Sequence, residues 1–251
     1  MLASSRCREL EASPQQESQP VRAPRAAAHC AVKQVAGREI GTEITTLDIS
    51  GWALTQVEVR EFATVLPHLL RLAVVTCDST GDPERRNGGP KSYTLNVQDA
   101  SMDLSSKSFG SADTTLLAVW IQRPEVSATV KKVVLSNNFI FGSKVGYDYQ
   151  GYTITVHDVD ADQSGWIALC GALPGSPVEE LIVADIGMGV NGVTSLAKAT
   201  SSMAVLAVVN VLGACPTHQL FPHHCTNMLA FVIHVCWRLG YQNIRYQHIS
   251  V

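Results

Sequence analysis

Apolar residues recur in short strand-like segments along the middle of the chain, and each segment follows the same spacing. This spacing is the strand-and-turn pattern L-x-x-L-x-L-x-x-N/C-x-L, which Val130, Val133, Leu135, Asn138 and Ile140 match at every position. Further matches are Ile44, Leu47, Ile49 and Leu54 with Trp52 in the Asn place; Leu69, Leu72, Val74 and Cys77; Val178, Leu181, Val183 and Met188; Met203, Leu206 and Val208; and, more weakly, Met102, Leu104 and Phe109. The first matching residues of two pairs of segments, 44 and 69, and 178 and 203, are both 25 residues apart. The equal spacing predicts an internal repeat.

The segments between the predicted strands have apolar residues three and four apart, which is typical of a helix with one buried side. They cover residues 57–66, 112–121, 165–173 and 193–199. Asp113 and Ser164 stand where helix N-caps are expected, and Pro67, Pro124 and Pro174 stand where helices should end. Each unit therefore reads as strand, turn, short helix and return. Stacked units of this kind share a core that one unit cannot form alone.

Alternation within the strands predicts which residues point inward. We expect parallel strands near 46–50, 71–75, 102–105, 132–136, 180–184 and 205–209, in that spatial order. The residues expected to point into the core are Leu47, Ile49, Leu135, Leu181 and Val183. The residues expected on the exposed side, where a partner would bind, are Thr45, Thr46, Asp48, Ser50, Asp103, Ser105, Lys131, Lys132, Ser136, Glu179, Glu180 and Asp185. On the last strand the outward residues are all apolar: Ala204, Val205, Ala207 and Val209.

The pattern resembles the leucine-rich repeat family, in particular its ribonuclease-inhibitor-like subclass, over about residues 41–213. The resemblance implies an α/β solenoid with parallel strands on the concave side and short helices on the convex side. Residues 78–93 and 142–156 look like insertions, and with the 120–126 segment they are similar to insert-bearing repeats of microalgal, dinoflagellate-type multi-repeat proteins. Asn138 alone keeps the family's turn asparagine, whose amide bonds neighbouring turn backbone. Other residues stand at the equivalent positions of the remaining units: Trp52, Lys107, Ile186 and Val211.

The two ends of the chain differ from its middle. Residues 1–40 are predicted to be a disordered tail, because 10–28 is rich in Pro, Gln, Ser, Ala and Arg and poor in large apolar groups. Residues 214–251 contain no acid and no lysine, and they read either as a cap over the last strand or as a disordered tail. The cleanest apolar run, 228–237, has half of the about 20 residues that span a bilayer, so we expect no membrane association.

Composition narrows the classes of partner. The 251 residues are 46% apolar, and the formal net charge is −3. Residues 41–213 hold 11 Lys and Arg against 18 Asp and Glu, and a net charge of −7 disfavours nucleic acid as a partner. The seven cysteines are widely spaced without a C-x-x-C pair, which is typical of reduced thiols and predicts an intracellular, cytoplasmic protein.

One glycine motif offers a catalytic or nucleotide-binding alternative. Gly187, Gly189 and Gly192 form a G-x-G-x-x-G run between a strand-like and a helix-like segment, which is the context of a dinucleotide fingerprint. That fingerprint needs an acid about 20 residues further on, but no Asp or Glu follows Asp185. The chain also has no G-x-S-x-G elbow, no phosphate loop and no H-E-x-x-H. We therefore predict a non-catalytic protein-interaction module without cofactor or small-molecule substrate.

Two groups of residues have some of the features of metal sites. Asp158, Asp160 and Asp162 begin like a calcium loop, but Gln163 and Leu169 replace its Gly and Glu. We interpret these aspartates as a solvated loop that leads into a helix N-terminus. Soft ligands gather near the C-terminus at Cys215, His218, His223, His224, Cys225, His234 and Cys236. Their spacing is only loosely that of a zinc knuckle, so a zinc-stabilised tail is an alternative to a metal-free one.

Overall fold

The computed structural model describes residues 32–85, 88–147, 154–203 and 208–210, which form a mixed α/β structure. The strands are β1 (Val32–Val35), β2 (Arg38–Gly41), β3 (Thr46–Asp48), β4 (Val74–Asp78), β5 (Ser92–Asn96), β6 (Ser101–Asp103), β7 (Lys132–Val134), β8 (Lys144–Tyr147), β9 (Ile154–His157), β10 (Glu180–Ile182) and β11 (Val208–Asn210). The helices are α1 (Gln56–Val65), α2 (Ser111–Ile121), α3 (Pro124–Ser127), α4 (Ser164–Ala172) and α5 (Val190–Ser201), with single 3₁₀ turns at Leu66–His68 and Leu173–Gly175.

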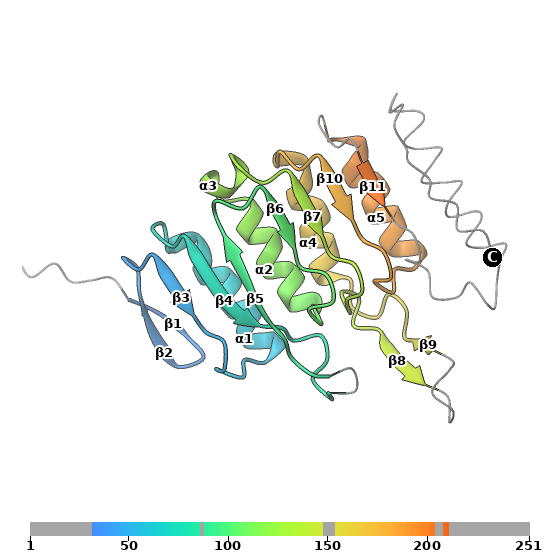
Figure 1. The fold of residues 1–251 in the computed structure, drawn as a ribbon, viewed down its shortest axis with the longest axis horizontal. Coiled ribbons are helices and arrows are strands. Elements are labelled where there is room, and N and C mark those ends of the chain that lie inside the picture. Colours follow the sequence, from blue (N-terminus) through green and yellow to red (C-terminus); the bar gives the residue numbers. More distant parts are fainter. Residues whose placement is uncertain (1–31, 86–87, 148–153, 204–207, 211–251) are drawn as a thin grey trace, which may run out of the picture.

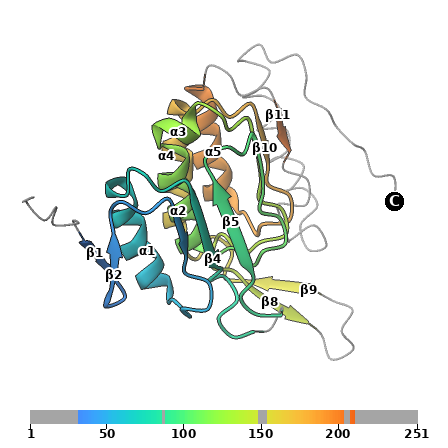
Figure 2. The ribbon, with the colours of Figure 1, turned by 60° about the vertical axis from the view of Figure 1, so that its left-hand side comes forward.

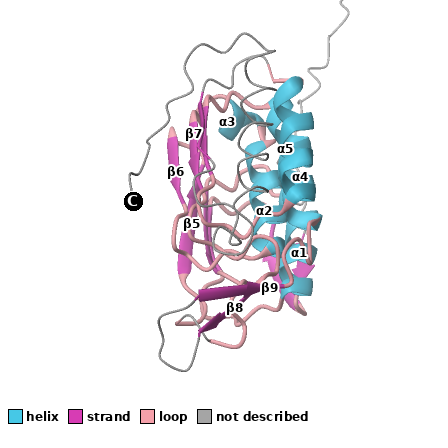
Figure 3. Cartoon of the chain, turned by 90° about the vertical axis from the view of Figure 1, so that its right-hand side faces the viewer, coloured by secondary structure: helices cyan, strands magenta, loops and turns pink. Residues whose placement is uncertain are grey.

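Strands and helices form two layers, which Figures 1 and 3 show from the front and from the side. Helices α1, α2, α4 and α5 pack side by side in that order behind the strands. The largest buried side chains between the layers are Trp120, Trp166, Phe62, Phe109 and Phe141. Hairpin β8–β9 projects from one end of the two layers (Figure 2). One hydrophobic core therefore holds both layers together.

The six predicted strands are present in the predicted order, but they do not form one parallel sheet. Strands β6, β7, β10 and β11 are parallel neighbours, and β3 is parallel to β4. Strand β5 then pairs antiparallel with β4, so the strand layer divides into two sheets. The predicted insertion at 78–93 is the cause, because the chain turns back within it and runs along β4 as β5. The second predicted insertion, at 142–156, contributes the β8–β9 hairpin.

Strand pairing does not follow the predicted spacing of 25 residues. Thr46 pairs with Val74 and Glu180 with Val208, so 28 residues separate equivalent positions in both places, not 25. The predicted spacing depends on apolar residues of the connections as well as of the strands, and Leu69 is buried just after a 3₁₀ turn, outside β4. The same shift makes the outward prediction for Val209 wrong, because Val209 pairs with buried Leu181 and packs against the core.

All four predicted helices are present, and prolines follow three of them as expected. The predicted caps are wrong in detail. Gly110 is the N-cap of α2, with Asp113 three residues inside the helix, and Gln163 is the N-cap of α4, with Ser164 at the first helical position. The clear capping box is instead that of α1, in which Thr55 and Glu58 bond each other's backbone N–H.

The N-terminal segment departs from the prediction of a disordered tail up to residue 40. Residues 32–41 form the β1–β2 hairpin, whose turn at Ala36 and Gly37 has positive φ at both positions. Val35 and Ile40 are buried in the core. The composition of the segment could not predict this hairpin, because two buried side chains are too few to raise its apolar content. Residues 1–31 and 214–251, with the tail, cap and zinc hypotheses made for them, lie outside the described residues, as do Ala204, Val205 and Ala207.

Candidate functional site

The side of the strand layer that faces away from the helices is open to solvent, and we call it the open face. The twelve residues predicted there are all exposed or half-buried. Their neighbours in the alternation point inward, and Ile49, Leu135, Leu181 and Val183 are at most 2% exposed. Leu47 also packs against the core but stays half-buried, because β3 is the edge strand of its sheet. The predicted alternation is thus confirmed, while a binding role for these twelve residues stays a prediction.

One half of the open face, over β7 and β10, carries charges that neutralise each other. Lys131 Nζ lies 2.8 Å from Glu179 Oε1, and Lys132 Nζ lies 3.0 Å from Glu180 Oε1. Lys132 and Glu180 are register partners in adjacent strands, so the pairs bridge the strands directly. The structure therefore brings these four predicted residues together in two ion pairs.

The other half, over β3 to β6, carries carboxylates held by hydroxyl and amide groups. Oδ1 of Asp48 accepts from the N–H and hydroxyl of Ser50, at 2.9 and 2.6 Å, and Asp103 is bonded in the same way by Ser105. The serine hydroxyls, and then the serine amides, lower the pKa of both carboxyls, so both are ionised at neutral pH.

A third carboxylate of this half was missed by the sequence analysis. Asp78 accepts from the N–H of Gly51 at 2.7 Å and from the hydroxyl of Ser92 at 2.5 Å. The repeated Asp-x-Ser spacing at Asp48 and Asp103 is a signal that was available in the sequence, whereas Asp78 meets its partners only through strand pairing. Among the described residues, none of the three carboxylates forms an ion pair within 4.0 Å.

The glycine motif lies at the N-terminus of α5, where a carboxylate of the same chain already binds. Asp160 accepts from the N–H of Gly189 at 2.8 Å and from that of Asn191 at 3.1 Å. A side chain at position 189 would collide with Asp160, and one at 192 would collide with Phe141. These two glycines therefore allow close packing, and the amides that a phosphate would use are taken.

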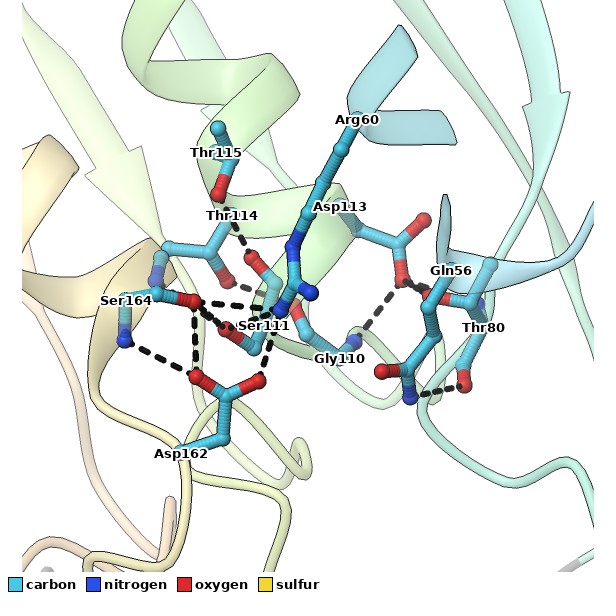
Figure 4. A network of polar contacts seen from close by, with 11 residues as sticks. Gln56, Arg60, Thr80, Gly110, Ser111, Asp113, Thr114, Thr115, Asp162 and Ser164 are labelled. Carbon is cyan, nitrogen blue, oxygen red and sulfur yellow. Dashed lines mark hydrogen bonds and ion pairs between the residues drawn. The ribbon is translucent and has the colours of Figure 1, made fainter. Parts of the chain in front are cut away.

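Asp162, from the same loop, binds the N-terminal end of α4 and joins it to α1 (Figure 4). It accepts from the N–H of Ser164 at 3.0 Å and from Arg60 Nη2 at 2.6 Å. Arg60 also reaches the hydroxyls of Ser111 and Ser164, which lie 2.9 Å apart. Partial burial raises the pKa of Asp162, but the hydrogen bonds from Ser164 and Arg60 outweigh it and the pKa is lowered. The aspartate loop that the sequence predicted to be solvated and to lead into a helix N-terminus thus binds the N-terminal ends of α4 and α5 through Asp162 and Asp160.

Asp113 is fully buried where the 79–91 loop meets α2 (Figure 4). Its carboxylate accepts from the N–H and hydroxyl of Thr80, from the N–H of Gly110 and from the hydroxyl of Tyr93, all within 3.1 Å. Burial raises the pKa of Asp113 to about 6 against these bonds. Burial also raises the pKa of the neighbouring Cys77 thiol and Tyr93 phenol. Asp113, Cys77 and Tyr93 are all buried, so this site fixes the loop to α2 and is not placed to act on a substrate.

Asn138 joins the turns that follow the neighbouring strands β6 and β7, and its amide bonds turn backbone as expected. Its amide nitrogen donates to the carbonyls of Leu104 and Leu135, both at 2.8 Å. Its oxygen accepts from the backbone N–H groups of Lys107 and Phe109, at 3.1 and 2.9 Å. One buried side chain thus satisfies four backbone groups of two turns.

The described residues hold no group of three or more His, Cys, Asp or Glu placed to bind a metal ion. None of the helices in the described ranges is both long enough and apolar enough to cross a membrane. No protein-family model matches the chain, and no curated protein is significantly similar to it.

Proposed function

We propose that the chain is a leucine-rich repeat module of the ribonuclease-inhibitor-like kind, which binds a protein partner through its open face and catalyses no reaction. Support for the repeat comes from the parallel strand pairs, whose equivalent residues are twice 28 apart, and from helices stacked in chain order. Asn138, with its bonds to two turns, has the role that the family pattern requires. An intracellular setting belongs to the proposal, and Cys77 and Cys170 are free buried thiols.

The observation that carries the proposal is the open face itself. Its exposed residues come from six strands and combine hydroxyls, carboxylates and two neutralised lysine pairs. A broad, mixed polar surface on a rigid sheet suits contact with another protein. The net charge of −7 over residues 41–213 opposes binding to polyphosphate backbones.

The helix ends favour this proposal over the nucleotide-binding alternative. The N-termini of α1, α2, α4 and α5 are bonded by carboxylates of the chain, those of Glu58, Asp113, Asp162 and Asp160. An anion would have to displace a carboxylate at each of these ends. No observation favours nucleotide binding at Gly187–Gly192.

The test is affinity capture from the native cell with matched surface variants of the full chain. The double variant Asp48→Lys, Asp103→Lys changes the open face, and Thr64→Lys places one new charge on exposed α1 as a control. We expect wild type and Thr64→Lys to capture the same proteins and the double variant to lose at least one of them. Identical sets from all three would contradict the proposal, provided that the melting temperatures agree.

A further inference from the structure

The strand layer is interrupted between β5 and β6. Both strands are described in full, yet they do not pair with each other, and each is the edge strand of its own sheet. Hydrogen-bonded neighbours keep their Cα atoms about 4.5–5.5 Å apart. The Cα–Cα distances between β5 and β6 instead exceed 8 Å for almost all residue pairs. The two strand edges are therefore too far apart to bond each other, and neither edge has a strand partner on this side.

The free edge of β5 points into this gap. The N–H of Val97 donates to the carbonyl of Ala73 at 3.0 Å, which places this residue in a hydrogen-bonded pair with the β4 side. Backbone groups alternate in direction along an antiparallel strand. The N–H and C=O groups of Ser92 and Thr94 therefore point away from β4 and toward β6.

The free edge of β6 points into the same gap from the other side. The N–H of Leu104 donates to the carbonyl of Val134 at 2.9 Å, so the even-numbered residues of this segment bond β7. The N–H and C=O groups of Ser101 and Asp103 therefore point toward β5. Two rows of backbone donors and acceptors thus face each other on the open face, and such rows are templates for a further strand.

The surroundings of the gap define what could fill it. On the inward side, Tyr93 and Phe109 are in contact with tilted rings whose centroids lie 4.4 Å apart, and Leu95 and Met102 are at most 3% exposed. Side chains pointing inward from an added strand therefore have to be small. Side chains pointing outward would lie near Asp103 on β6 and could reach Asp78 on β4, one strand beyond β5. Neither carboxylate has an ion-pair partner within 4.0 Å among the described residues.

We propose that the gap between β5 and β6 docks an extended polypeptide segment with small and basic residues in alternation, which completes the sheet. The segment hydrogen-bonds to both free edges, and its Lys or Arg side chains pair with Asp78 and Asp103. The stretch that pairs is short, because β6 has three residues. This inference rests on the proposed function, since it names the kind of partner segment that the open face binds.

The test uses the full chain and a labelled peptide, acetyl-Lys-Ala-Lys-Ala-Lys-Ala-Lys-amide, in low salt. A second peptide has the same sequence and charge but N-methyl groups on alternate amides, which removes backbone donors without changing the protein. We expect the methylated peptide to bind at least about tenfold more weakly, which corresponds to the loss of one or more hydrogen bonds. We also expect the peptide to slow hydrogen exchange at the amides of Thr94 and Ser101.

Protein variants separate charge from strand pairing. Asp78→Asn with Asp103→Asn should weaken binding of the lysine peptide at least about tenfold, whereas Glu39→Gln with Glu61→Gln, which neutralises two exposed carboxylates outside the open face, should leave it unchanged. Equal binding of the methylated peptide, or no binding of the lysine peptide, overturns the proposal. So does unchanged exchange at Thr94 and Ser101. If the Asp48→Lys, Asp103→Lys variant loses a native partner while that partner leaves the Thr94 amide unprotected, the docking gap fails and the proposed function stands.

Discussion

The two sheets of the strand layer complete the same strand pattern in different ways. In the region of β6, β7 and β10, each strand leads to a helix that packs behind the layer, directly or after the β8–β9 hairpin. In the region of β3 to β5, the chain after β4 returns as an antiparallel strand with no helix between. The first region covers its core with apolar helix faces. The second needs a buried carboxylate, Asp113, to bond the loop that replaces a helix. The two regions thus differ at the β4–β5 connection, which is held by polar anchoring instead of by a packed helix.

The largest expected effect tests the packed region. Leu135 is fully buried, so Leu135→Ala should lower the free energy of unfolding by about 2–5 kcal/mol. Leu47, half-buried in the other sheet, should lose only about 1–2 kcal/mol on the same change. Urea unfolding of both variants measures the difference. Leu70→Ala, at a side chain that is 75% exposed, is the control and should stay within about 0.5 kcal/mol of wild type.

The two regions can also be compared at their turns, through Asn138 and the residue at the corresponding position near β3. Asn138→Ala leaves buried backbone groups of two turns without partners and should cost about 2–4 kcal/mol. The equivalent position in the first unit is Trp52, which is half-buried beneath the Arg38 guanidinium at 4.3 Å, and Trp52→Ala should cost about 1 kcal/mol. Thermal unfolding of the two variants under the same conditions shows which one loses more stability. Equal losses would mean that Asn138 does not hold the turns.

Asp113 tests the polar anchoring through pH. Burial raises its folded-state pKa to about 6, above the unfolded value of 3.8, so the folded chain holds a proton that the unfolded chain releases. The stabilisation from this group is complete below pH 3.8 and is lost as the pH rises through 6. Relative to Asp113→Asn, wild type should therefore lose about 1–3 kcal/mol between pH 4 and 7. Carbon-13 titration of the carboxyl checks the cause, and a midpoint below pH 4 would show that its four hydrogen bonds outweigh burial.

Asp160 tests whether the end of α5 is a capped helix or an anion site. Asp160→Ala exposes the amides of Gly189 and Asn191 and should cost about 1 kcal/mol, while Asp160→Asn should cost less. Sulfate should raise the melting temperature of Asp160→Ala more than that of wild type at equal ionic strength. If sulfate raises the melting temperature of wild type by as much, the end of α5 binds anions despite Asp160, and nucleotide binding becomes the better interpretation.

The smallest effect is expected for the ion pairs of the open face. Lys132 and Glu180 lie 3.0 Å apart with about a third of each side chain exposed. Lys132→Met should therefore change the free energy of unfolding by no more than about 0.5 kcal/mol. A larger loss that salt removes would show that charge pairing also holds β7 and β10 together.

The sequence by itself determined the features that repeat locally. Alternating burial in strands and three-four spacing in helices depend only on near neighbours, and they placed the inward rows from Ile49 to Val183 correctly. The Asn138 turn followed from the same pattern. The β1–β2 hairpin was not predicted because Val35 and Ile40 are buried by α1, which lies further along the chain.

Only the tertiary structure decided how these elements pair and where the polar groups go. Strand direction at β5, the 28-residue register and the inward position of Val209 depend on partners far away in sequence. The bonds of Asp113, Asp160 and Asp162 join loops to helices, over as many as 102 residues between Arg60 and Asp162. A carboxylate in a loop looks the same in the sequence whether it meets water, a metal ion or a helix amide. Its partner depends on which chain segments the core brings together, and hydrophobic periodicity does not encode that choice.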